Sequence, residues 1–303
     1  MSSVIVEHIY KHFGKVKAID DISFAVERGE LFGFIGPDGA GKTTLFRILT
    51  TLLVPDKGMA VVNGLDVVKD YRKIRQDIGY MPGRFSLYTD LSVEENLNFY
   101  ATVFGTTVAE NYDLIRDIYV QIEPFKKRKA GKLSGGMKQK LALSCALIHK
   151  PSVLILDEPT TGVDAVSRLE FWEMLKRLKQ SGITIIVATP YMDEAGLCDR
   201  VALIQAGKIM AVSPPSEVIK TYPWQLFSVK ADDIFSLLND LRQFPGSHTV
   251  YAFGQAAHIS FREGDVNEAM IREYMRDRGN KELQVSPIQA NIEDCFMELM
   301  IKT

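Results

Sequence analysis

The chain has 303 residues, enough for one large α/β domain with a smaller second domain or for two domains of similar size. Its apolar fraction of 46% and charged fraction of 24% are typical of a globular protein. A formal net charge of −2 argues against the basic surface that a nucleic-acid partner requires. The three widely separated cysteines argue against a disulfide framework or a zinc site and favour free thiols in a reducing compartment.

No stretch approaches the 18 or so consecutive apolar residues of a membrane-spanning helix. The longest apolar runs, such as residues 183–188, have the length of a strand. The first ten residues lack the charged and apolar regions of a signal peptide. We therefore expect a soluble, cytoplasmic polypeptide that reaches a membrane only through a partner.

Residues 4–9 and 19–26 alternate between apolar and polar side chains and predict two strands joined by a turn around Gly14. Phe13 precedes this turn, in a segment that could fold back over a bound nucleotide. Its ring is either a stacking platform for an adenine or an ordinary hairpin aromatic. Taken alone, the segment favours the second interpretation.

Residues 36–44 read GPDGAGKTT, after the apolar run 31–35 and before a segment with helical apolar spacing. Strand, glycine-rich turn and helix are the context in which this pattern is a phosphate loop. Glycines let backbone N–H groups close around phosphate oxygens, and the start of the helix adds further donors. Lys42 then bridges the β- and γ-phosphates, and the Thr43 hydroxyl joins the Mg²⁺ shell. The predicted ATP-binding residues are Gly36, Pro37, Asp38, Gly39, Ala40, Gly41, Lys42, Thr43 and Thr44.

The next part of the chain predicts a short strand at 59–62, a polar helix near 67–74 and a strand at 78–81 that Pro82 and Gly83 end. Two helices follow, at 92–104 and 112–122, and Ser92 with Glu95 forms a capping box for the first. These helices predict a separate helical lobe at about residues 84–148, suited to moving or docking.

Residues 133–139 read LSGGMKQ and precede a predicted helix at 140–148. Gly135 and Gly136 present bare backbone N–H groups to an anion, and Ser134 adds a hydroxyl donor. Alone, this pattern is also a common linker fragment. It gains weight because PSVLILDEPT follows at residues 151–160.

Four apolar residues followed by two acids predict a buried parallel strand. Such a strand places Asp157 and Glu158 at the carboxyl edge of the sheet. The two side chains point to opposite faces, so they do different work. We expect Asp157 to hold Mg²⁺ through water and Glu158 to orient and polarise the attacking water.

A helix at 166–179, with Leu169, Trp172, Leu175 and Leu178 on one face, a strand at 183–188 and a hairpin at 201–212 complete the first domain, 1–222. Prolines at 214, 215 and 223 mark the boundary. Residues 223–303 predict an accessory α+β domain in the order strand, helix, strand, strand, helix, strand, which is ferredoxin-like. That order specifies no function.

The phosphate loop, LSGGMKQ and LILDEPT occur in one order within one domain. Together they resemble the nucleotide-binding subunit of ABC transporters over residues 4–222, and the tail at 288–296 looks like that of the drug- and antibiotic-exporter branch. The resemblance implies an α/β P-loop NTPase domain of the ABC type with a helical subdomain, followed by the small ferredoxin-like domain.

The resemblance also implies the assembly and its cofactors. Two such domains form a head-to-tail dimer with two Mg-ATP sandwiched between them, each held by residues 36–44 of one chain and by Ser134, Gly135 and Gly136 of the other. Asp164 lies on the dimer contact, and Lys42 and Glu158 are the catalytic residues. The lobe around 84–100 receives a cytoplasmic helix of a polytopic membrane permease, so the subunit is peripheral on the inner face of the plasma membrane. Phe13 becomes an adenine-stacking residue.

Two positions depart from the family pattern. Gly83 replaces the usual glutamine, and Pro190 replaces the histidine that reaches the γ-phosphate. Glycine cannot ligate Mg²⁺ through a side chain, and proline has no N–H donor. Losing one preorganised group costs about 10²–10³ in rate, but Glu158 is retained. We therefore expect handicapped hydrolysis and favour a heterodimer, although a homodimer stays open.

Three functions compete. The first is the ATP-driven motor subunit of a membrane exporter. The second is a soluble ABC-type ATPase that acts on ribosomes or DNA, for which the chain lacks basic surface and a charged insert. The third is a regulatory module that binds ATP with little hydrolysis, which Gly83 and Pro190 support. The transported substrate cannot be read from this chain.

Overall fold

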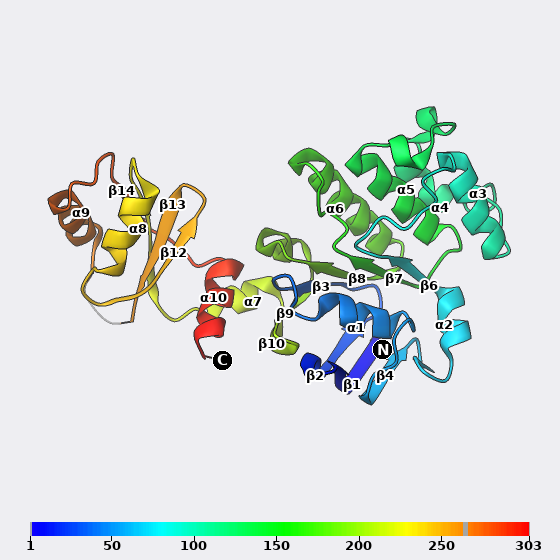
Figure 1. Ribbon diagram of the computed structural model, residues 1–303, viewed down its shortest axis with the longest axis horizontal. Helices are drawn as coiled ribbons and strands as arrows, with labels where there is room; N and C mark the ends of the chain where they lie inside the picture. The colour runs from blue at the N-terminus through cyan, green and yellow to red at the C-terminus, as the bar shows by residue number, and fades with distance from the viewer. Residues whose placement is uncertain (1, 263–265, 303) are drawn as a thin grey trace. The chain divides into compact units, whose positions relative to one another are not determined.

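The computed structural model describes residues 2–262 and 266–302, and contact clustering divides the chain into two compact units, 1–215 and 216–303 (Figure 1). The boundary comes before the one expected after Tyr222, because most of helix α7 (Pro215–Lys220) belongs to the second unit. There the Cys295 thiol donates to the carbonyl oxygen of Val218 at 3.5 Å.

A six-stranded sheet in the order β10-β9-β3-β8-β7-β6 forms the centre of the first unit. All neighbouring strands are parallel except β10, which pairs with β9 in the antiparallel direction. The strands are β3 (Leu31–Ile35), β6 (Ile78–Met81), β7 (Val153–Asp157), β8 (Thr184–Thr189), β9 (Arg200–Gln205) and β10 (Lys208–Ser213). Every residue of β3, β7 and β8 is buried, as expected of strands covered on both faces.

A second, antiparallel sheet in the order β2-β1-β4-β5 lies across helix α1 (Lys42–Leu49) from the six-stranded sheet (Figure 1). Its strands are β1 (Ser2–Phe13), β2 (Val16–Glu27), β4 (Lys57–Val62) and β5 (Leu65–Asp66). One apolar core joins the two sheets through α1, where the rings of Phe34 and Phe46 meet edge to face at 5.7 Å. The first helix is therefore held on both sides.

Helix α6 (Ala165–Gln180) covers the other face of the six-stranded sheet (Figure 1). Trp172, Leu175 and Leu178 are buried as predicted. Leu169 was predicted to share that face, and this was wrong, because its side chain is 61% exposed.

The helical lobe contains α3 (Val93–Val103), α4 (Tyr112–Tyr119), α5 (Gly135–Leu147) and the short 3₁₀ helices η1 (Glu123–Phe125) and η2 (Ala130–Lys132). The capping box is confirmed: the Glu95 N–H donates to Ser92 Oγ at 3.2 Å, and the Ser92 N–H donates to Glu95 Oε2 at 2.7 Å. Helix α5 begins earlier than the predicted residue 140, because Ser134 caps it and accepts from the Met137 N–H.

Helix α2 (Tyr71–Asp77) begins later than the predicted residue 67. The Asp66 carboxylate accepts the N–H groups of Val68 and Lys69, both at 2.9 Å. This local turn competes with the helix, so the backbone becomes helical only after Asp70.

The second unit has an antiparallel sheet in the order β12-β13-β11-β14. The predicted ferredoxin-like order is confirmed by β11 (Gln225–Lys230), α8 (Ile234–Arg242), β12 (Ser247–Phe253), β13 (Ala256–Phe261), α9 (Glu268–Asp277) and β14 (Gln284–Pro287), with α10 (Ile292–Lys302) following. Helices α8 and α9 pack their apolar residues, such as Leu237 and Ile271, into one core with the sheet.

Two expectations from composition can be compared with the described residues. Cys145, Cys198 and Cys295 are free and buried, as expected. Among the residues that the structure describes, no helix combines the length and apolarity needed to cross a membrane.

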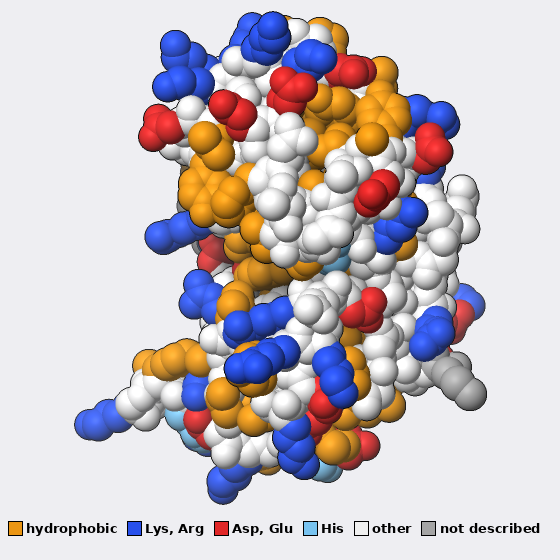
Figure 2. Space-filling view, turned by 90° about the vertical axis from the view of Figure 1, so that its right-hand side faces the viewer, with side chains coloured by type: hydrophobic (Ala, Val, Ile, Leu, Met, Phe, Trp, Pro, Cys, Tyr) orange, Lys and Arg blue, Asp and Glu red, His pale blue; other side chains and the backbone are white. Residues whose placement is uncertain are grey.

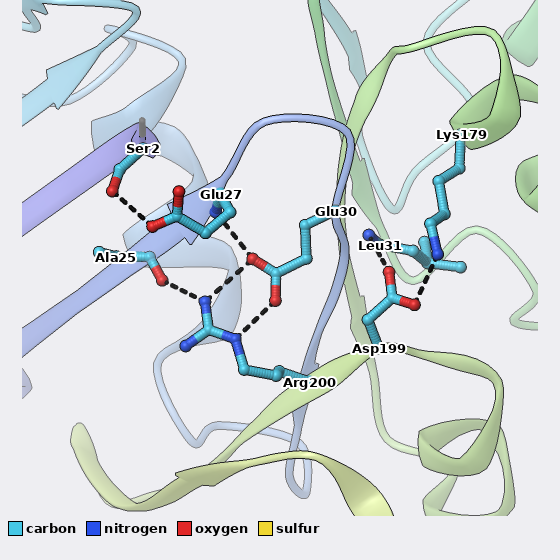
Figure 3. A network of polar contacts seen from close by, with 8 residues as sticks. All are labelled: Ser2, Ala25, Glu27, Glu30, Leu31, Lys179, Asp199 and Arg200. Carbon is cyan, nitrogen blue, oxygen red and sulfur yellow. Dashed lines mark hydrogen bonds and ion pairs between the residues drawn. The ribbon is translucent and has the colours of Figure 1, made fainter.

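An ion-pair group joins the connection between the two sheets of the first unit to strand β9 (Figure 3). Arg200 makes a bidentate contact with Glu30 at 2.6 and 2.9 Å, and it also donates to the carbonyl oxygen of Ala25 on β2 at 2.9 Å. The neighbouring Asp199 accepts the first N–H of β3 at 2.8 Å. Because β2 belongs to one sheet and β9 to the other, these contacts fix the start of β3, which leads directly into the phosphate loop.

Candidate active site

The phosphate loop connects the carboxyl end of β3 to the start of α1, as predicted. Gly41 has φ +106° and would bring a Cβ within 2.4 Å of the Ala18 carbonyl oxygen; a Cβ on Gly36 would come within 2.1 Å of the Ile204 carbonyl oxygen. Only glycine fits at these two close approaches. Gly41 is also the N-cap of α1 and has no side chain to occupy the first N–H groups, so they remain available to an anion.

The loop borders a hollow of about 390 Å³, a size suited to a small-molecule ligand. Its lining residues come from β2, the loop, the end of β7 and the β9–β10 turn. They are Val16, Lys17, Ala18, Gly39, Gly41, Lys42, Thr43, Thr44, Glu158 and Ala206.

Lys42 places a cation inside the loop. Its side chain is buried, and its Nζ donates to the carbonyl oxygens of Gly36 at 2.7 Å and Pro37 at 3.0 Å. The same Nζ lies 3.5 Å from Glu158 Oε1. The two predicted catalytic residues therefore form an ion pair.

The Thr43 hydroxyl donates to Asp157 Oδ1 at 3.2 Å, so the two predicted Mg²⁺ ligands are neighbours. Asp157 is buried. Burial raises the pKa of the Asp157 carboxyl, and the charge of Glu158 acts in the same direction, whereas the hydrogen bond from Thr43 lowers it. Two oxygen ligands, one of them a buried carboxylate, suit a hard cation such as Mg²⁺.

Glu158 and Asp157 have different surroundings, as their adjacent positions predicted. Glu158 has φ +50°, which is unusual for a residue with a side chain, and its N–H donates to the Ala188 carbonyl oxygen at 2.8 Å. Its side chain is 24% exposed and lines the hollow, whereas Asp157 is turned toward Thr43. A strained backbone at such a position is typical of functional sites.

Gly83 and Pro190, which depart from the family pattern, both lie beside these groups. A Cβ at position 83 would be 3.2 Å from the Asp157 carbonyl oxygen and 3.8 Å from its carboxyl carbon. Pro190 follows the last residue of β8, Thr189, whose carbonyl oxygen accepts the Gly36 N–H at 3.4 Å. A side chain at position 83 would thus start next to the predicted Mg²⁺ ligand, and Pro190 follows a residue bonded to the phosphate loop.

The predicted signature residues lie together but apart from this hollow. A Cβ on Gly136 would be 3.0 Å from Ser167 Oγ, and a Cβ on Gly135 would be 3.2 Å from the Gly162 carbonyl oxygen. Asp164 caps α6 by accepting the Ser167 N–H at 3.0 Å. Ser134, Gly135, Gly136 and Asp164 therefore occupy the adjoining starts of α5 and α6, and none is among the described residues that line the hollow.

Phe13 ends β1 with its side chain 52% exposed. It is not among the described residues that line the hollow, although Val16, across the turn from it, is. Its role in adenine stacking stays a prediction.

Sequence reasoning missed four residues that line the hollow: Val16, Lys17, Ala18 and Ala206. The turn carrying Ala206 is held to β2 because the Asp20 N–H donates to the Gly207 carbonyl oxygen at 2.9 Å. Nothing in the local sequence indicates this contact between residues so far apart. The structure explains the glycine at position 207, which has φ +77° and would bring a Cβ within 2.8 Å of the Ala18 carbonyl oxygen.

Comparisons with known proteins agree with this geometry. Residues 19–161 match the family model described as ABC transporter. The Nod factor export ATP-binding protein I of Burkholderia lata is 33% identical over 296 residues, which cover 96% of this chain and 95% of that protein. The probable multidrug ABC transporter ATP-binding protein YbhF of Escherichia coli is 42% identical over 214 residues, which cover 70% of this chain and 37% of that relative's length.

Among solved structures, cbiO1 from Clostridium perfringens, part of the ABC transporter complex cbiONQ, superposes with a TM-score of 0.65 at 28% identity. The match covers 73% of this chain and 91% of that one. The Nod factor relative is more than 30% identical over nearly its full length, so the chain belongs to the ABC transporter family.

Proposed function

We propose that this chain binds Mg-ATP in the hollow at the phosphate loop and hydrolyses it to drive a separate membrane subunit of an exporter. The observation that carries the proposal is the convergence of Lys42, Thr43, Asp157 and Glu158 on one loop. A soluble ATPase acting on ribosomes or DNA is not favoured, because the relatives at 33–42% identity are transporter proteins.

In this proposal the triphosphate lies against the free N–H groups at the start of α1, and Lys42 turns from the loop carbonyl oxygens to the β- and γ-phosphates. Thr43 and Asp157 hold Mg²⁺, which neutralises phosphate charge when bound. Glu158, released from Lys42, orients water for attack on the γ-phosphorus. ATP and water give ADP and phosphate.

Burial of the Asp157 carboxylate has a cost for the stability of the folded protein. A raised carboxyl pKa means that the charged form is disfavoured in the folded state. This loss of stability is fully present at pH values well above the pKa of Asp157 in the folded protein. It shrinks as the pH falls through that pKa and vanishes below the pKa of the same carboxyl in the unfolded chain. Burial of Asp157 therefore lowers the free energy of unfolding at neutral pH, and a cation bound between Asp157 and Thr43 would offset this loss.

We expect Asp157→Asn to raise the melting temperature of the chain in EDTA by a few degrees at pH 7.5 and by less at pH 5.0. Scanning calorimetry of the wild type and of Asp157→Asn, each without nucleotide, measures the two melting temperatures. Asp164→Asn is the matched control, because the N–H of Ser167 holds the pKa of exposed Asp164 below its usual value. A melting temperature lowered by Asp157→Asn at pH 7.5 would contradict the expected penalty.

Lys42→Ala tests ATP binding directly. Without the buried ammonium the phosphates lose their main cationic partner, so isothermal titration with Mg-ATP should show binding weakened by about 100-fold or more, of the order given by loss of one charged hydrogen-bonding partner. Lys57→Ala, an exposed lysine on β4, should bind like the wild type. Equal affinities for wild type and Lys42→Ala would rule out this nucleotide site.

We further propose that the working dimer is asymmetric. In the family arrangement, Ser134, Gly135 and Gly136 complete the ATP site of the second subunit, with Asp164 at the contact. This chain offers those residues intact, but its own site has Gly83 beside Asp157 and Pro190 after β8. A partner ATPase with the usual glutamine and histidine would then carry out most of the turnover.

Pro190→His should raise ATP turnover of the lone chain by about tenfold or more, because it restores one donor near the γ-phosphate. A phosphate-release assay of wild type, Pro190→His and Pro190→Ala separates the imidazole from the mere loss of proline. A fast wild-type chain whose rate Glu158→Gln abolishes would count against the asymmetric dimer.

An apolar cleft of about 250 Å³ supports the docking of a permease at the helical lobe. Its lining residues come from the end of α1, from β6 and from α3 and α5, and include Leu52, Met81, Leu87, Tyr100, Phe104 and Cys145. Figure 2 faces the side of α2 and α3 and shows hydrophobic side chains in a hollow between the upper and lower parts, with Lys and Arg below them. We propose that a cytoplasmic helix of a polytopic permease fills this cleft and holds the subunit at the inner face of the plasma membrane.

Leu52→Asp should reduce by about tenfold the amount of polytopic membrane protein that co-purifies with the tagged chain from detergent extracts. Leu52 lines the cleft and is 57% exposed, so a charge there disturbs docking with little effect on folding. Val120→Asp, at the end of α4 and 51% exposed, is the matched control. Undiminished recovery with Leu52→Asp would exclude this cleft as the docking site.

A further inference from the structure

A buried carboxylate outside the hollow joins three segments of the candidate site. Glu194 lies in the 3₁₀ helix η3 (Met192–Leu197) and is 1% exposed. Its Oε1 accepts from Thr160 Oγ1 at 2.8 Å and from Arg168 Nε at 3.2 Å, and its Oε2 accepts from Thr189 Oγ1 at 2.5 Å. Three donors from different parts of the chain thus converge on one side chain.

Two of these donors belong to the segments that carry the reacting groups. Thr160 is two residues beyond Glu158, after β7 has ended. Thr189 is the last residue of β8, and its hydroxyl also accepts the Tyr191 N–H at 3.1 Å, so its contacts enclose Pro190. Glu194 therefore adds side-chain contacts to both segments at the carboxyl edge of the sheet.

The third donor connects these segments to the signature. Arg168 lies on α6, and its guanidinium stacks 4.3 Å over the Tyr191 ring. The preceding residue, Ser167, is the one whose hydroxyl lies against Gly136. Arg168 is therefore the neighbour, on α6, of the residue that lies against the signature segment.

We propose that Glu194 is a positioning residue for ATP hydrolysis, which ties the Glu158 segment and the position-190 segment to α6 and the signature. The inference rests on the proposed function. A buried carboxylate with three donors holds them strongly, because loss of any one leaves a polar group unpaired away from water. Since Glu194 is not among the residues lining the hollow, it should affect the rate of the chemical step and not the binding of Mg-ATP.

The test compares full-length wild type, Glu194→Gln and the double variant Thr160→Val, Thr189→Val. Single-turnover hydrolysis with the chain in excess measures the chemical step, and isothermal titration measures Mg-ATP affinity. Both variants should hydrolyse about tenfold to a hundredfold more slowly, as expected for a displacement of about 1 Å, with affinities within about twofold of the wild type. Because Glu194→Gln keeps the side-chain volume and one acceptor oxygen, it also decides the matter should the double variant fail to fold.

Asp193→Asn provides the matched control. Asp193 binds the same Arg168 at 3.0 Å, but its side chain is 74% exposed, so its loss should leave hydrolysis within about twofold. Wild-type rates in both test variants would overturn the positioning role, as would a loss of Mg-ATP affinity equal to the loss of rate, which indicates a structural role only. A wild-type chain that does not bind Mg-ATP would instead refute the proposed function.

Discussion

The site depends on one arrangement, in which two consecutive residues at the start of α1 meet two consecutive acids at the end of β7. Thr43 bonds to Asp157 and Lys42 pairs with Glu158. This is possible because β3 and β7 both flank β8 in the parallel direction, so their carboxyl ends reach the same edge of the sheet. Burial of α1 between the two sheets then holds its first turn against that edge.

The same arrangement has an energetic cost. Lys42 and Asp157 are both buried, which costs each charged group its contact with water, and Glu158 has a strained backbone. Lys42 is paired with loop carbonyl oxygens and with Glu158. In the proposed function, the triphosphate would replace these partners, which belong to the loop and to the end of β7 and not to the interior of the sheet.

The sequence predicts the features that depend on nearby residues. The phosphate loop, the buried strand before Asp157 and the capping box at Ser92 each have a short pattern with a physical cause, and the structure contains all three. The predicted start of α2 was wrong because the turn that the Asp66 carboxylate stabilises competes with the helix that the apolar spacing indicated. Leu169 was misplaced because apolar spacing does not reveal which neighbours cover a helix.

Long-range polar contacts leave no such pattern. Thr160, Arg168, Thr189 and Glu194 are ordinary polar residues in the sequence, and their convergence requires that β7, β8, α6 and η3 be packed. The position of Gly83 against Asp157 is likewise a product of the parallel pairing of β6 and β7. The family resemblance identified residue 83 as unusual, but only the fold shows that a side chain there would start beside the predicted metal ligand Asp157.

The signature segment and the hollow at the phosphate loop differ in how completely they match the family pattern. The signature start is well supported, since Ser134 caps α5, Ser167 backs Gly136 and Asp164 caps α6. The hollow keeps its loop, its lysine and both acids but has glycine and proline at two surrounding positions. Glu194 bonds both to Arg168 on α6 and to Thr189 at the end of β8, so it connects the two regions by direct contact. In the proposed asymmetric dimer, these contacts would link the chain's own site to the signature segment that completes the site of a second subunit.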